Sequence, residues 1–150
     1  MQDDPTPAEL TIAVVEFLRR DLLPSLKGHL GFQLRVSINA LDLVARQLTR
    51  EAAANEAESR RLVALLGHGG ELPTLNRELY EAIASGHMSL STAGLADHLW
   101  ASTMEKLAVD QPTYASYRRE SERDVGFVRP ARENDMVGIE GKAVPETPGR

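Results

Sequence analysis

The chain of 150 residues contains no cysteine, which excludes a disulfide scaffold, a thiolate zinc site, an iron–sulfur cluster and a cysteine nucleophile. Aromatic residues make up only 5% of it, so any core must be mainly aliphatic. No apolar run approaches the roughly 20 residues of a membrane span, and the acidic first ten residues do not resemble a secretory signal. We therefore expect a cytoplasmic protein with a single domain, since this length suits one core.

Excess positive charge is also missing, because the formal net charge is −5. That balance argues against a general nucleic-acid binder, and acidic residues alternate with the arginines of residues 118–132. The four histidines are 39, 19 and 11 residues apart, so none has the spacing of a metal-binding pair on a helix. We expect no metal and no cofactor. Known catalytic motifs are absent from the sequence, which favours a non-enzyme and leaves only a new type of enzyme open.

The hydrophobic spacing is helical and shows no strand-like alternation, so the sequence predicts an all-α fold. Thr6, Pro7 and Glu9 form the signature of a helix start. Residues 32–66 contain neither proline nor glycine and predict one long helix, with a break or kink favoured near residues 54–55. We expect a bundle of four to five helices around residues 32–48. The remaining helices are predicted at residues 74–85, from residue 89 or 91 to about 109, and at 114–123.

The long helix is apolar on two nearly opposite sides, one of them carrying Phe32, Val36 and Leu43. Such a helix is expected to lie between neighbouring helices or subunits, which makes a homodimer plausible. Between the apolar sides runs a polar stripe with the spacing i, i+4, i+7, i+11. Its members are Arg35, Asn39, Asp42 and Arg46.

Two interpretations of the polar stripe remain open. It faces water or forms an internal ion-pair ladder, in which Asp42 pairs with Arg46. Alternatively, its guanidinium groups bind the carboxylate or phosphate of a ligand or partner, because a planar fork holds two oxygens at once. Lys106 falls among apolar positions of its own helix, so its stem either lies along the protein surface or reaches the same anion.

The composition changes after residue 123, so residues 1–123 are predicted to form the helical domain and residues 124–150 a C-terminal arm. The arm is rich in glycine and proline but retains apolar side chains. It is either a frayed tail or an extended arm that docks on a partner. The residues predicted for such docking are Phe127, Val128, Met136, Val137 and Ile139.

Two segments, residues 24–48 and 105–114, resemble a family of small bacterial helical proteins described only as a domain of unknown function. The first segment has a proline, an apolar residue and a glycine, followed by residues at helical spacing; the second reads Lys-Leu-Ala-Val-x-x-Pro-x-Tyr. The resemblance covers roughly residues 8–117, with Gln47 where the family pattern has glutamate. The matching residues are Pro24, Leu26, Gly28, Phe32, Arg35, Val36, Asn39, Leu41, Arg46 and those of 106–114.

The resemblance implies a gene neighbourhood with aminoglycoside-phosphotransferase-like kinases and acyl-CoA dehydrogenases, and thus a place in fatty-acid or hydroxy-acid catabolism. Our leading hypothesis is a non-catalytic accessory protein that binds such a kinase or dehydrogenase through the long helix and the arm. The alternative is a binding module for an acyl-CoA-like or other anionic ligand. In that case Arg35, Asn39, Arg46 and Lys106 would hold its carboxylate or phosphates.

Overall fold

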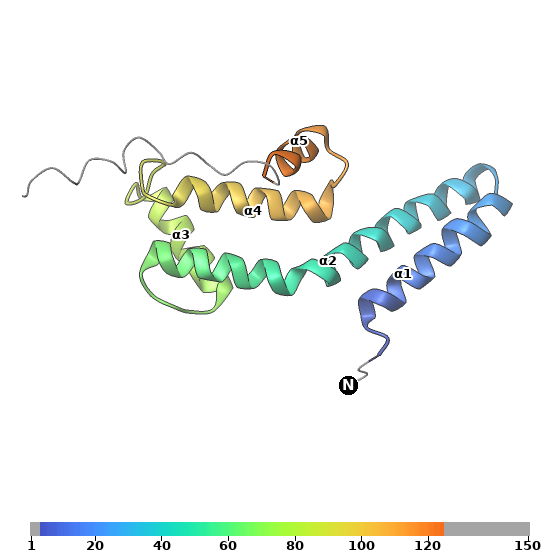
Figure 1. The fold of residues 1–150 in the computed structure, drawn as a ribbon, viewed down its shortest axis with the longest axis horizontal. Coiled ribbons are helices and arrows are strands. Elements are labelled where there is room, and N and C mark those ends of the chain that lie inside the picture. The colour runs from blue at the N-terminus through green and yellow to red at the C-terminus, as the bar shows by residue number, and fades with distance from the viewer. Residues whose placement is uncertain (1–3, 125–150) are drawn as a thin grey trace, which may run out of the picture.

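The computed structural model describes residues 4–124, and every regular element in that range is helical (Figure 1). The predicted all-α class with one long helix is therefore confirmed. α1 continues through a π-helical turn, Leu18–Leu22, and a 3-10 turn, Leu23–Ser25, before the long helix α2 begins. The α-helices are α1 (Pro7–Phe17), α2 (Gly28–Leu66), α3 (Leu72–Ala84), α4 (Leu95–Asp110) and α5 (Ala115–Asp124).

The start of α1 is the predicted capping box. The Thr6 side chain accepts a hydrogen bond from the Glu9 backbone N–H at 3.3 Å. In return, the Glu9 carboxylate accepts one from the Thr6 backbone N–H at 2.8 Å. These hydrogen bonds hold the pKa of Glu9 below its ordinary value. Pro7 occupies the first turn, where its missing N–H costs nothing.

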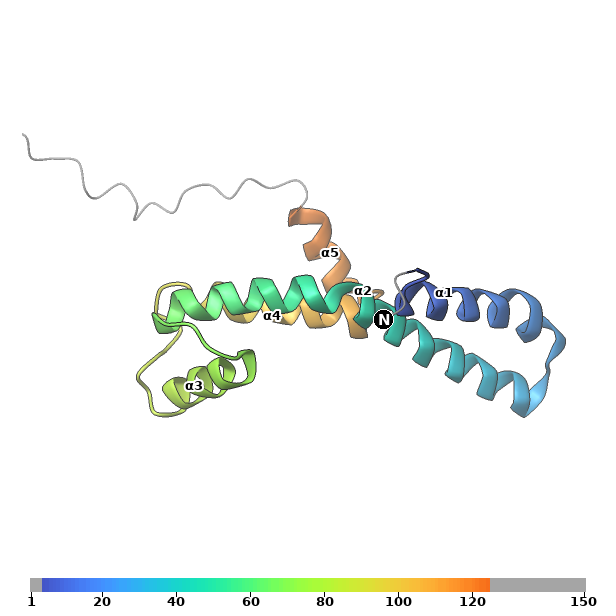
Figure 2. The same ribbon diagram turned by 90° about the horizontal axis from the view of Figure 1, so that it is seen from below.

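α2 is a continuous α-helix of 39 residues, about 58 Å long at ~1.5 Å per residue. The break that the sequence favoured near residues 54–55 is not formed, because alanine and glutamate are strong helix formers. The helix does change direction near its middle, between the half that lies beside α1 and the half that lies beside α4 (Figures 1 and 2). The helix also begins four residues earlier than predicted. It ends at Gly67, which has a left-handed backbone conformation (φ of 82°) that glycine adopts easily because it has no Cβ. The Gly67 N–H donates to the Val63 carbonyl.

α2 is packed by different helices along its two halves (Figures 1 and 2). Its first half forms an antiparallel hairpin with α1, whereas α3 and α4 pack along its second half. The main apolar core consists of Leu62, Leu75, Leu79 and Leu95, which join α2, α3 and α4. The expectation that the bundle centres on residues 32–48 is therefore wrong. Among residues 4–124, α1 and the turns after it cover most of that segment, and α4 reaches it at Arg46.

The helices of residues 4–124 are charged at short intervals. Even α2, with its 39 residues, has no stretch apolar enough to cross a membrane, and the same holds for the other helices in this range. α5 matches the short helix predicted at residues 114–123, and it follows α4 as a separate element. The predicted arm lies outside the described residues apart from its first position.

Candidate functional site

The structure divides the predicted polar stripe into two parts. Asp42 accepts an ion-paired hydrogen bond from Arg19 of the hairpin rather than from Arg46. Arg46 is half-buried, and its Nε donates to the backbone carbonyl of Val109 near the end of α4, at 2.6 Å. Both side chains therefore hold the first half of α2 to its neighbours. The expected ladder between Asp42 and Arg46 is not formed.

Arg35 and Asn39, the other two members of the stripe, are exposed. Neither makes a hydrogen bond or ion pair with the described part of the chain. They lie beside Phe32, Val36 and Leu43, which are 59%, 51% and 39% exposed. We call these five residues the outer face of α2.

The outer face is exposed because α1 covers the opposite side of the helix. Gly31, Ile38 and Ala45 are the buried residues of this half of α2. At about 100° per residue, Phe32, Val36 and Leu43 point about 140° away from them on average. The sequence predicted a helix covered on two sides, and residues 4–124 cover only one side of this half.

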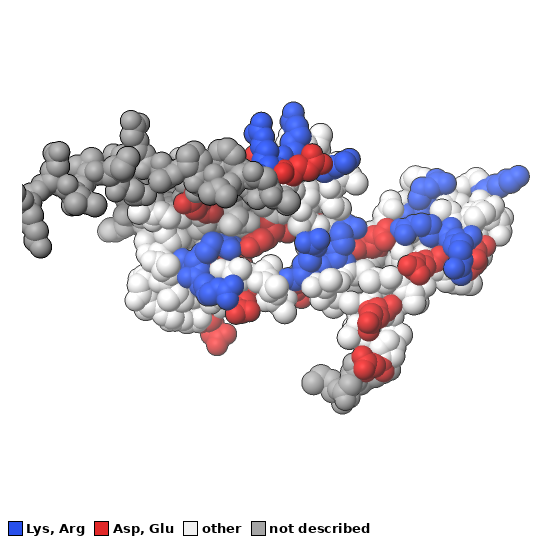
Figure 3. All heavy atoms as spheres, viewed as in Figure 1, with Lys and Arg blue, Asp and Glu red and all other residues white. Residues whose placement is uncertain are grey.

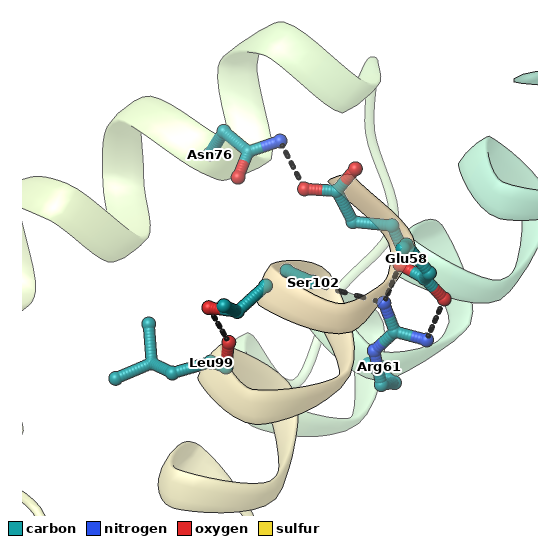
Figure 4. Close-up of polar contacts among 7 residues, drawn as sticks. Glu58, Arg61, Asn76, Leu99 and Ser102 are labelled. Atoms are coloured by element: carbon teal, nitrogen blue, oxygen red, sulfur yellow. Dashed lines mark hydrogen bonds and ion pairs between the residues drawn. The ribbon is translucent and has the colours of Figure 1, made fainter. Parts of the chain in front are cut away.

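A second polar group, which the sequence did not reveal, lies between α2 and α4 (Figure 4). The Arg61 guanidinium donates to both carboxylate oxygens of Glu105, at 3.0 and 2.6 Å. The two side chains are only 24% and 29% exposed. A bidentate pair with this little solvent contact positions both helices strongly. Arg61 lies in a highly charged run that resembles a solvated surface; its only distinguishing signal is the apolar Leu62 beside it.

α3 and His98 complete this buried polar cluster. The Asn76 side chain donates to Glu58 at 3.0 Å, which ties α3 to α2 (Figure 4). His98 on α4 is only 3% exposed, and its Nδ1 has no hydrogen-bond partner in the part of the chain that the structure describes. Burial lowers the pKa of His98 below its ordinary value, and the positive charge of Arg61 lowers it further, while Glu58 acts in the opposite direction.

Lys106 lies apart from the outer face. Its side chain is exposed and lines a small groove of about 180 Å³ between α2 and α4, where Glu51 and Asp110 also lie. A larger groove of about 530 Å³ runs between α2, α4 and α5, over Ala53, Ala54 and other residues. The four residues of the polar stripe line neither groove. The structure therefore does not bring Lys106 together with Arg35 and Asn39.

The surface charge is mixed on the face drawn in Figure 3. Basic side chains on the hairpin, on the middle of α2 and on α5 each have acidic neighbours, so no broad field of one sign forms there. A phosphate backbone is bound by just such a field. The predicted docking residues of the arm lie outside the described part of the chain: Phe127, Val128, Met136, Val137 and Ile139.

The comparisons agree with the resemblance noted in the sequence. The model of the family described as "Domain of unknown function (DUF6285)" matches residues 24–114. This range includes both segments that carry the resemblance, α2, α3 and α4, and it starts after α1, later than the expected residue 8. Neither curated proteins nor solved structures gave a significant match. Because the match covers more than half of the chain, the protein belongs to the DUF6285 family.

Proposed function

We propose that this protein is a non-catalytic accessory protein that binds a partner protein through the outer face of α2. The observation that carries the proposal is the composition of that face. Three large apolar side chains stand exposed beside an arginine and an asparagine that have no hydrogen-bond or ion-pair partner among residues 4–124. Single exposed apolar residues are ordinary, but a continuous stripe of them on a rigid helix is typical of a binding surface.

The residue types suit a protein partner. Aromatic and arginine side chains near the centre of an interface are among the types that contribute most binding free energy. Phe32 would fill an apolar pocket of the partner, while Arg35 pairs with a carboxylate or carbonyl there. Since α2 is held by α1 from behind, the face is rigid before binding, which lowers the entropic cost of association.

The partner class follows from the resemblance. It suggests a phosphotransferase-like kinase or an acyl-CoA dehydrogenase of fatty-acid or hydroxy-acid catabolism, in the cytoplasm. The arm after residue 123 would extend the same contact through its apolar residues. The proposal assigns no catalytic role to the chain.

The alternative, a module that binds an acyl-CoA-like or other anionic ligand, has less support. Its four proposed residues would have to converge on one cavity. Arg46 is engaged by the Val109 carbonyl, and Arg35 and Asn39 stand on a convex helix face. Lys106 lines a groove that contains none of them. Concave, largely enclosed sites are the rule for small ligands.

The experiment is co-purification of the full chain after co-expression with each candidate partner. We expect a stoichiometric complex with one of them. Phe32→Asp and Arg35→Ala should weaken it at least about 10-fold, as expected for central interface residues. Tyr80→Asp is the matched control, because Tyr80 is 70% exposed on α3 and lies away from the outer face. Failure to co-purify with either candidate, or a complex equally sensitive to Tyr80→Asp, contradicts the proposal.

A further inference from the structure

The hairpin of α1 and the first half of α2 is a layer of only two helices. Among the described elements, α1 contacts α2 and the π-helical turn that follows it, and no other helix (Figures 1 and 2). α1 has only 11 residues, a length at which an isolated helix is marginal in water. Helices become stable in proteins by burying an apolar face against a second layer, and residues 4–124 supply none for this hairpin.

The ion pair between Arg19 and Asp42 shows which sides of the two helices lie together. We call a residue inner when it faces the other helix of the hairpin; Leu18 and Leu41 are such residues. Arg19 and Asp42 directly follow them and pair with each other. The positions that directly follow inner residues therefore lie on one side of the hairpin. The positions that directly precede inner residues must then lie together on the opposite side of the hairpin. That side carries Leu10, Val14 and Phe17 from α1, and Val44 and Leu48 from α2.

We call these five residues the side face of the hairpin. They are all exposed, with fractions of 46%, 50% and 54% on α1 and 43% for both residues of α2. Side chains of this size and exposure leave roughly 450–500 Å² of apolar surface open, which is about three-fifths of the ~800 Å² that each partner contributes to a standard interface. Interfaces are themselves about three-fifths apolar. The side face can therefore supply most of the apolar part of one partner's share of an interface.

The chemistry of the side face favours a second copy as its occupant. None of its five side chains is charged, so two identical faces meet without repulsion. Each copy supplies two antiparallel helices, and two such hairpins placed face to face make a four-helix bundle, a common solution for burying helical stripes. A two-fold axis satisfies both copies with the same contacts.

We infer that two copies of this chain associate through the side face, so that their hairpins form an intermolecular four-helix bundle. This inference does not depend on the proposed function. The outer face of α2 points in a different direction and stays free for a partner protein in the dimer.

The test is sedimentation velocity of the purified full chain over a wide range of concentration. We expect a dimer that dissociates on dilution. Val14→Glu on α1 and Val44→Glu on α2 should each raise the dissociation constant at least about 100-fold, because the dimer would bury an unpaired carboxylate from each copy. Circular dichroism and thermal unfolding check that the variants remain helical, and two variants on different helices guard against misfolding of one.

Two matched controls are available in α2. Val63→Glu changes a valine that is 38% exposed in the second half of the helix, and Val36→Glu changes the outer face. Both variants should remain dimeric. A monomeric wild type, a dimer insensitive to both side-face variants, or a dimer lost equally with Val63→Glu overturns the inference. A dimer lost only with Val36→Glu also overturns the inference, because it shows that the outer face pairs with itself. Binding of a partner protein is measured in the separate co-purification experiment.

Discussion

At the scale of single residues, the least expected feature is a nearly buried histidine without a partner for Nδ1. His98 packs against α2 at 3% exposure. The charged groups around it are Arg61 and Glu58 from α2, with Glu105 and Lys106 from its own helix. Burial and Arg61 both oppose protonation, so the neutral imidazole is the form that fits the folded chain.

The stability of the protein should therefore depend on pH through His98. The pKa of His98 lies below its ordinary value of about 6.5 in the folded chain, so the unfolded chain binds more protons between the two values. The contribution of His98 to the free energy of unfolding is complete above about pH 6.5. It is lost as the pH falls towards the pKa that His98 has in the folded chain. Its slope is at most about 1.4 kcal/mol per pH unit for one group. Urea unfolding at a series of pH values measures it.

Two variants separate His98 from the other titrating groups. His98→Gln should remove this part of the slope, whatever its effect on overall stability. His29→Gln is the control, since His29 is exposed near the start of α2. If His98→Gln and the wild type lose the same free energy of unfolding as the pH falls below 6.5, the lowered pKa of His98 does not cause the pH dependence.

At the scale of elements, the turn between α1 and α2 depends on one close approach. A Cβ atom added at Gly31 would lie 2.8 Å from the backbone oxygen of Leu26 and 3.2 Å from its carbonyl carbon. Both atoms belong to the backbone and have little freedom to move. The first turn of α2 folds back over the preceding segment only because residue 31 has no side chain. The sequence does not reveal this close approach, because it depends on how the chain turns between Leu26 and Gly31.

Gly31→Ala should destabilise the protein by about 1–3 kcal/mol, because the new methyl group overpacks the turn. This loss of stability is opposite to the usual effect of the substitution, since alanine inside a helix is ordinarily favoured over glycine by about 1 kcal/mol. Gly69→Ala is the control: nothing lies within 4 Å of its added Cβ. Chemical denaturation of both variants measures the difference. A Gly31→Ala variant as stable as the wild type would show that the turn adjusts freely.

At the scale of the whole molecule, α2 connects two regions that are packed by different partners. The second region is closed by Arg61 and Glu105, which lie 44 positions apart in sequence. Arg60, the neighbour of Arg61, makes only an exposed pair with Glu56 on its own helix, at 69% and 70% exposure. Two adjacent arginines of α2 thus have different environments, and the position of α4 is the cause.

A double-mutant cycle should show this difference. Arg61→Met and Glu105→Met should couple by about 1–2 kcal/mol, since each single change leaves the other group half-buried without its partner. The same cycle on Arg60 and Glu56 should give no more than about 0.5 kcal/mol, as is usual for an exposed helix pair. Equal coupling energies for the two cycles would mean that the α2–α4 pair is solvated like a surface pair.

The sequence by itself determined the helical class, the capping box at Thr6 and the apolar stripe of Phe32, Val36 and Leu43. These features depend on neighbours within a turn or two, and local spacing and propensity encode them. The sequence also placed the ends of the helices well, but it missed the starts of α2 and α4 by four to six residues. Continuity of α2 through its alanine-rich segment was misjudged, because helix propensity outweighed the expected break.

Only the tertiary structure decided what each face of α2 contacts. Asp42 pairs with Arg19, Arg46 with the Val109 carbonyl and Arg61 with Glu105, and each of these partners is at least 23 positions away. Sequence spacing shows that a side chain lies on a given face of a helix, but it does not show which helix covers that face. That choice depends on how the helices pack in space, and it leaves Arg35, Asn39 and the two apolar faces of the hairpin exposed.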